Sequence, residues 1–151
     1  MLAKAQGELV SITIEGKVNE CFDKTIGESL QQDSRGKQKR LSFLCEELGL
    51  AGIPTTIRYQ LLHRTASAII EAKRFNAKSA VMIVHSFNQE HLWFEDYAAF
   101  ASLFGATAKQ GELVSLQNTG GIAIYSGWVT GDPRFLKDLN NEKAIRSAVI
   151  S

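Results

Sequence analysis

Hydrophobic and polar residues alternate over Leu9–Glu15, near the start of the chain. Successive side chains of a β-strand point to opposite faces, so the apolar positions of Val10–Ile14 share one face. The polar positions, which end with Glu15, share the other face. Lys17 follows Glu15 by two residues, and the two charged groups therefore emerge on the same polar face if the strand continues.

Two stretches with helical periodicity follow this strand. Residues 37–48 carry an apolar stripe and end at Gly49, a residue type that commonly ends helices. Residues 57–75 give the strongest helical signal in the chain, because apolar residues recur there every three or four positions. The polar stretch 19–36, which precedes both helices, is predicted to be irregular.

The second half of the chain contains strand and helix patterns in turn. Ala80–Val84 is apolar without alternation, which predicts a strand buried on both faces. A helix is predicted over 95–104. Strands over 113–117 and 122–128 are joined by a turn at 118–121.

These elements favour an α/β fold with a mixed central sheet and helices packed on its faces. A length of 151 residues is enough for one domain, so residues 1–151 are predicted to form a single domain. Asp132 and Pro133 can start a short helix over 134–139. The polar tail after about residue 140 is expected to be loosely attached.

Composition excludes several classes of partner. The 17 basic and 16 acidic residues give a net charge of +1, so nucleic acid could be held only by a local basic patch. The apolar runs are too short to span a bilayer, which predicts no membrane partner. Cys21 and Cys45 lack metal-ligand spacing and are expected to be reduced thiols of a cytoplasmic protein.

Three segments carry a resemblance to a known superfamily. They are Glu15-Gly16-Lys17 at the strand end, Arg58–Thr65 in the long helix, and Ala80–Phe87 in the buried strand. In this order they resemble the PD-(D/E)xK nuclease-like superfamily, and more narrowly a bacterial family of unknown function with that core. The resemblance implies a restriction-endonuclease-like sheet and a divalent-metal-dependent nuclease that hydrolyses phosphodiesters.

The resemblance also implies roles for individual residues. Glu15 would bind Mg²⁺, with the carbonyl of Gly16 as a second ligand. Lys17 would orient the attacking water or stabilise the charge that builds on the phosphate, and Gln60 would approach the same site from the helix. Magnesium prefers oxygen ligands and activates water, so the chemistry is consistent with these residue types.

Basic residues provide the predicted contacts to nucleic acid. Arg58 and Arg64 lie in the helical segment that carries the resemblance, and both are candidates for binding phosphates. A basic cluster within residues 35–40 could also touch phosphates, although the solvated start of a helix commonly has this composition.

One part of the superfamily pattern is missing from this sequence. An acidic residue, usually Asp, is expected on the preceding strand, whereas Glu8 falls on the opposite face of the strand from Glu15. The chain is therefore expected to be an N-terminally short form with an incomplete metal site. A carboxylate from Glu20, Asp23 or a partner chain would complete that site.

Alternatives remain open for the function and for each candidate residue. Besides the nuclease, the chain could be a non-catalytic interaction module or a self-associating subunit derived from the same core. Glu15 and Lys17 could form an ordinary surface ion pair. Gln60, Arg64 and Glu71 could belong to a solvent-facing stripe of the helix. His63 is expected to be packed rather than a ligand.

Overall fold

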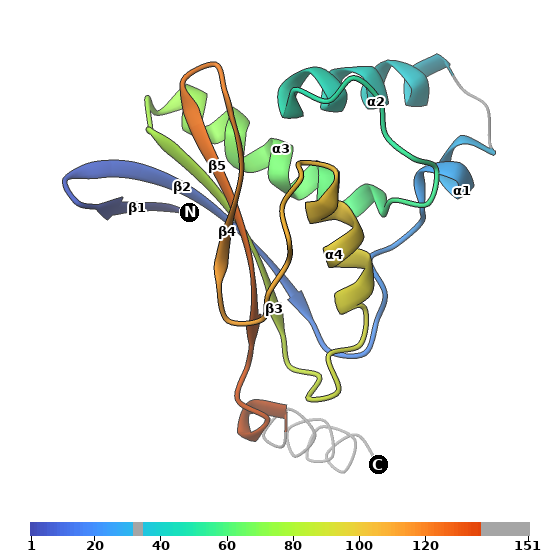
Figure 1. Ribbon diagram of the computed structural model, residues 1–151, viewed down its shortest axis with the longest axis vertical. Coiled ribbons are helices and arrows are strands. Elements are labelled where there is room, and N and C mark those ends of the chain that lie inside the picture. The colour runs from blue at the N-terminus through green and yellow to red at the C-terminus, as the bar shows by residue number, and fades with distance from the viewer. Residues whose placement is uncertain (32–34, 137–151) are drawn as a thin grey trace, which may run out of the picture.

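A five-stranded mixed sheet forms the centre of the molecule (Figure 1). The computed structural model describes residues 1–31 and 35–136. The strands of the sheet are β1 (Leu2–Ala5), β2 (Glu8–Lys17), β3 (Ser79–Ser86), β4 (Leu113–Thr119) and β5 (Ile122–Thr130). Their order is β1-β2-β3-β5-β4, with β2, β3 and β5 parallel and the two edge strands antiparallel to their neighbours. The predicted α/β fold with a mixed sheet is confirmed.

Helices connect the strands and build the second layer. The helices are α1 (Ile26–Leu30), α2 (Arg35–Leu48), α3 (Tyr59–Arg74) and α4 (Phe94–Ser102). Helix α3 joins β2 to the parallel strand β3 and packs against both strands, while α2 packs on α3. A parallel pair of strands requires such a crossover, and the apolar stripe of α3 supplies the contact with the sheet.

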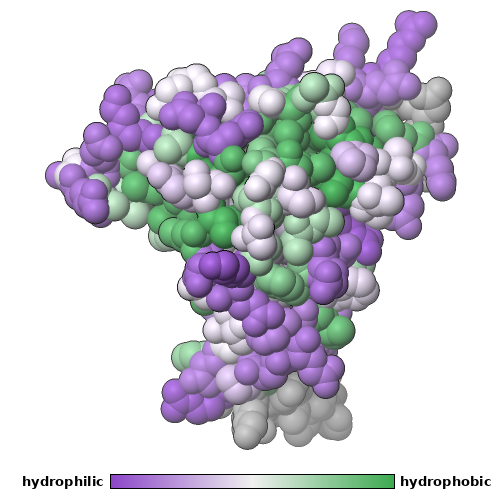
Figure 2. Space-filling model, in the orientation of Figure 1, coloured by the Kyte–Doolittle hydropathy of each residue, from purple (hydrophilic) through white to green (hydrophobic). Residues whose placement is uncertain are grey.

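An aromatic cluster anchors α4 to the sheet. The ring of Trp128 on β5 is fully buried and lies 5.7 Å from that of Tyr97 and 5.3 Å from that of Phe94 on α4. Phe22, in the segment after β2, meets the same indole edge-on at 6.3 Å. Large aromatic rings in such contacts contribute strongly to a core. In Figure 2, apolar side chains also reach the surface over the broad part of the molecule, between hydrophilic margins.

The two faces of the sheet differ in what covers them. Within residues 1–31 and 35–136, the helices pack against one face only, which corrects the expectation of helices on both faces. On β2 the covered face is the polar one: Ser11 and Glu15 are buried, whereas Ile14 is 51% exposed. Helix α3 supplies hydrogen-bonding partners for Thr13, Glu15 and Lys17 on this face. The Ser11 hydroxyl is buried on the same face without a partner.

Two elements are absent from the sequence-based prediction. Strand β1 forms a hairpin with β2 through Gln6 and Gly7, both at positive φ, as two-residue hairpin turns require. Helix α1 lies in the stretch that was predicted to be irregular. It starts with a capping box, in which the side chains of Thr25 and Glu28 each accept a hydrogen bond from the other residue's backbone.

The end of the chain is only partly described. Residues 134–136 of the short helix predicted over 134–139 are helical, and the remainder of that helix and the tail after 140 lie outside the described residues. None of the described helices is long and apolar enough to cross a membrane.

Replacing the central indole of the aromatic cluster tests how much it contributes to the stability of the fold. We expect Trp128→Ala to lower the free energy of unfolding by about 3–5 kcal/mol, because it leaves a large cavity. Phe75→Ala is the control, since that ring is 42% exposed, and we expect it to cost about 1 kcal/mol. Urea unfolding followed by circular dichroism measures both values, and equal losses would contradict this assignment.

Candidate functional site

The structure brings together the three residues that the sequence analysis placed at the candidate site. Glu15 and Lys17 project from the end of β2 towards the first turn of α3, which carries Gln60. The Gln60 amide nitrogen Nε2 donates to Glu15 Oε1 at 2.7 Å, and the Lys17 ammonium donates to Gln60 Oε1 at 2.8 Å. Lys17 Nζ and Glu15 Oε1 are 3.5 Å apart.

Arg64 is the fourth member of this cluster. Its Nε donates to Glu15 Oε2 at 2.5 Å, so both carboxylate oxygens of Glu15 accept hydrogen bonds. Arg64 lies one helical turn after Gln60, which places both side chains on the same side of α3. The backbone carbonyl of Arg64 also accepts a hydrogen bond from Thr13 Oγ1 at 3.0 Å. We call Glu15, Lys17, Gln60 and Arg64 the β2–α3 cluster.

The two β2 residues of the cluster are buried, which removes one of the alternatives. Glu15 is 7% exposed and Lys17 is 4% exposed, so the interpretation as a surface ion pair is wrong. A buried charge is costly unless it is paired and hydrogen-bonded. Lys17 meets both conditions: its ammonium also donates to the carbonyl of Cys21 at 2.9 Å and lies 5.0 Å from the centre of the Phe22 ring.

Magnesium does not fit the β2–α3 cluster in this arrangement. Mg²⁺ binds through oxygen ligands and favours carboxylates, and Glu15 supplies the cluster's single carboxylate. Gln60 and Arg64 occupy its two oxygens, and the Lys17 ammonium adds a positive charge beside them. Across the described residues, no group of three or more His, Cys, Asp or Glu side chains could hold a metal ion.

Of the two carboxylates of this chain expected to complete a metal site, that of Glu20 is already hydrogen-bonded to the backbone. Glu20 accepts hydrogen bonds from the amides of Val18 and Asn19 at 3.2 and 3.1 Å. Partial burial acts to raise the pKa of Glu20, but hydrogen bonds from nearby backbone amides outweigh it and the pKa lies below its usual value. Asp23 has a left-handed backbone with φ of 57°, and its carbonyl accepts a hydrogen bond from Arg58.

The preceding strand also leaves Glu15 without an acidic partner. Leu2 pairs with Ser11 and Ala5 pairs with Glu8, so the described part of β1 lies beside the first half of β2. No residue of this strand therefore pairs with Glu15. Glu8 itself is exposed at the far end of β2, as its position in the alternation indicated.

The other candidate residues lie around the cluster without joining it. Arg58 pairs with Asp96 at 2.9 Å and lies over the Trp93 ring at 5.7 Å, so it ties the start of α3 to α4. Its contact with nucleic acid stays a prediction. His63 is exposed and stacks on Tyr59 at 6.2 Å, which corrects its expected packed position.

The sequence offered one signal for the role of Arg64. Gln60 and Arg64 are four residues apart in a predicted helix, and side chains at that spacing are neighbours. A helix that places Gln60 over Glu15 can therefore place Arg64 there as well. The prediction that Arg64 binds nucleic acid follows from the superfamily resemblance and does not use this spacing.

The fold and the cluster together define an α/β protein with a charged, hydrogen-bonded cluster between a central strand and its crossover helix. The chain belongs to the family described as "Domain of unknown function (DUF6946)", which matches residues 1–133. No curated protein and no solved structure matches the chain.

Removing the charge of Glu15 tests the energetics of the cluster. We expect Glu15→Gln to lower the free energy of unfolding by about 3–5 kcal/mol, because Lys17 keeps its buried charge without a carboxylate. Arg64→Gln should cost about 1 kcal/mol, since the Arg64 side chain is 43% exposed.

Urea unfolding at neutral pH measures both variants. The double variant Glu15→Gln/Lys17→Met should recover part of the loss, because it removes the unpaired charge. A double variant no more stable than Glu15→Gln would contradict this account of the cluster.

Proposed function

We propose that this chain is a non-catalytic, self-associating interaction module built on a PD-(D/E)xK-like core. The observation that carries the proposal is the bonding of Glu15, whose two oxygens accept hydrogen bonds from Gln60 and Arg64. In a metal-dependent nuclease these oxygens would be available to the cation. Here they hold the crossover helix on the sheet.

A largely uncovered sheet face supplies the interaction surface. One row of paired residues crosses four strands of the sheet. Ile14 pairs with Ile83, Ile83 with Gly127, and Gly127 with Leu113. Ile14 is 51% exposed and Leu113 is 58% exposed. Gly127 has no side chain, and Leu113 and Ile83 lie against the space that one would fill. We call this row and its neighbours on the same face, which include Ile12, Val81, His85, Tyr125 and Val129, the open sheet face.

A second copy of the chain is the partner that the charge of this surface favours. The residues of the open sheet face carry no Lys, Arg, Asp or Glu side chain. Glu8 lies on the same face at the far end of β2, so two copies that meet over the row of Ile14 bring few like charges together. The net charge of +1 also adds little repulsion between copies. Exposed apolar patches commonly mark interaction sites, and two sheets can pack face to face with interdigitated side chains.

A charged residue on the open sheet face tests self-association. We expect the parent chain to sediment as a dimer at micromolar concentration and Ile14→Lys to weaken the dimer at least tenfold, about 1.4 kcal/mol, because the ammonium would be buried. Ile70→Lys is the control, since Ile70 is 38% exposed on α3, away from this face.

Sedimentation velocity over a range of concentrations makes the comparison. A parent chain that stays at the monomer mass of 16.6 kDa at all concentrations would contradict the proposal. Equal dissociation by Ile14→Lys and Ile70→Lys would contradict the location of the interface.

A metal-dependent nuclease is the second candidate function, and the convergence of Glu15, Lys17 and Gln60 favours it. Contacts of Arg58 and Arg64 with nucleic acid belong to this candidate. For Glu15 to act as a ligand, however, both Gln60 and Arg64 would have to release it.

Calorimetry with Mg²⁺ and Mn²⁺ separates the two candidates. We expect no binding heat and no cleavage of DNA or RNA by the parent chain, because the carboxylate of the cluster is already bonded. Binding heat and cleavage that disappear in a folded Glu15→Ala or Lys17→Met variant would establish the nuclease instead. Circular dichroism shows whether each variant is folded.

The proposal also places the protein in the cytoplasm. Cys21 and Cys45 are both free thiols, the usual state in a reducing compartment. Burial raises the pKa of the Cys45 thiol, which favours its less reactive protonated form.

A further inference from the structure

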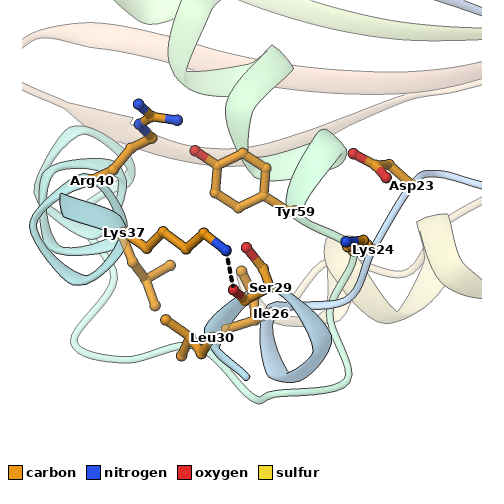
Figure 3. A pocket seen from close by; sticks show the side chains of 9 residues that line it. Asp23, Lys24, Ile26, Ser29, Leu30, Lys37, Arg40 and Tyr59 are labelled. Atoms are coloured by element: carbon orange, nitrogen blue, oxygen red, sulfur yellow. Dashed lines mark hydrogen bonds between the residues drawn. The ribbon is translucent and has the colours of Figure 1, made fainter. Parts of the chain in front are cut away.

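A small pocket lies between α1, α2 and the start of α3 (Figure 3). Its volume is about 170 Å³. Ile26, Leu30 and Leu41 form an apolar wall, and Ile26 is almost completely buried. A cavity of about 150 Å³ with such a lining can hold a benzene ring, so the space suits a ligand body of about one ring.

The remaining lining is mainly cationic. Lys24, Lys37 and Arg40 line the pocket together with the carboxylate of Asp23. The Lys37 ammonium is held at the pocket by its hydrogen bond to the carbonyl of Ser29 at 3.0 Å. In Figure 3, Asp23 lies on the other side of the tyrosine ring from Arg40. A concave site with this excess of positive charge attracts anions.

Tyr59 contributes a hydroxyl without a partner. Its oxygen is buried and has no hydrogen-bond partner in the described structure. A buried hydroxyl in this state is unfavourable, because nothing replaces the hydrogen bonds that it would make to water. Figure 3 shows the hydroxyl directed towards Arg40, whose exposed guanidinium forms no ion pair with the described residues. An acceptor oxygen placed between them would satisfy both donors.

We propose that this pocket binds a small organic anion that consists of a phosphate or carboxylate group on an apolar body of about one ring. The anionic group accepts hydrogen bonds from Tyr59 and Arg40, and the body packs on Ile26, Leu30 and Leu41. Binding requires the Arg40 side chain to move, because the Tyr59 hydroxyl is buried in this structure. The proposal does not depend on self-association or on the β2–α3 cluster.

Calorimetric titration with four probes tests the chemistry of the ligand. The probes are phenyl phosphate, benzoate, inorganic phosphate and benzyl alcohol. We expect at least one of the two aromatic anions to bind at millimolar concentration or below, at least tenfold more tightly than inorganic phosphate and benzyl alcohol. The aromatic anion that binds more tightly shows whether the pocket prefers a phosphate or a carboxylate group. No binding of either aromatic anion, or equal binding of inorganic phosphate or the neutral alcohol, overturns the proposal.

Three variants test the location of the site. Arg40→Gln should weaken the aromatic anion at least tenfold and Tyr59→Phe severalfold, because each removes one donor. Lys39→Gln is the matched control, since this exposed residue is on the same helix and does not line the pocket. Unchanged binding by Arg40→Gln or Tyr59→Phe, or an equal loss in Lys39→Gln, overturns the assignment. Urea unfolding confirms that each variant is folded.

Discussion

The bonds from Gln60 and Arg64 to the carboxylate of Glu15 are the constraint on which the rest of this structure depends. They connect the end of β2 to the first two turns of α3, and α3 is the helix that carries the chain across to β3. A hydrophobic contact between helix and sheet tolerates small sliding and rotation, whereas two hydrogen bonds to one carboxylate do not. The cluster therefore fixes the rotation of α3, and through α3 the positions of α2 and of the pocket beside it.

The hydrogen bonds of Glu15 also show why a nuclease-like arrangement of residues need not mean nuclease activity. Three polar residues can converge because a nuclease needs them, or because a buried strand end needs its charges satisfied. In this chain the second reason accounts for the hydrogen bonds and the ion pair of Glu15 and Lys17. The resemblance to the PD-(D/E)xK superfamily remains an interpretation of the sequence. The interaction surface and the pocket rest on features that lie outside the cluster.

How well each helix or strand can be predicted depends on how many residues of the sequence carry its pattern. Helix α3 and strand β3 could be predicted because many residues repeat one pattern. Strand β1 has only four residues, and α1 has five and depends on a capping box, so neither gives a measurable period. Strand alternation and the resemblance together predict that Glu15, Lys17 and Gln60 lie close to one another. The bond to Arg64 depends on the rotation of α3 over the sheet, and the neutral face of the sheet depends on strand order, which local patterns do not contain.

In β2 the helices cover the polar face, while apolar residues face outward. This arrangement affects how β2 reaches its correct register with β3. Hydrophobicity alone would favour Ile14 beneath α3 and Glu15 in water, and a slip of one residue between β2 and β3 would produce that arrangement. The native register instead exposes half of Ile14 and buries two charges. Collapse driven by apolar burial therefore has a competing product, and the polar contacts of Thr13, Glu15 and Lys17 discriminate against it. Strand β2 carries a local conflict between hydrophobicity and native pairing, which the polar end of the strand resolves.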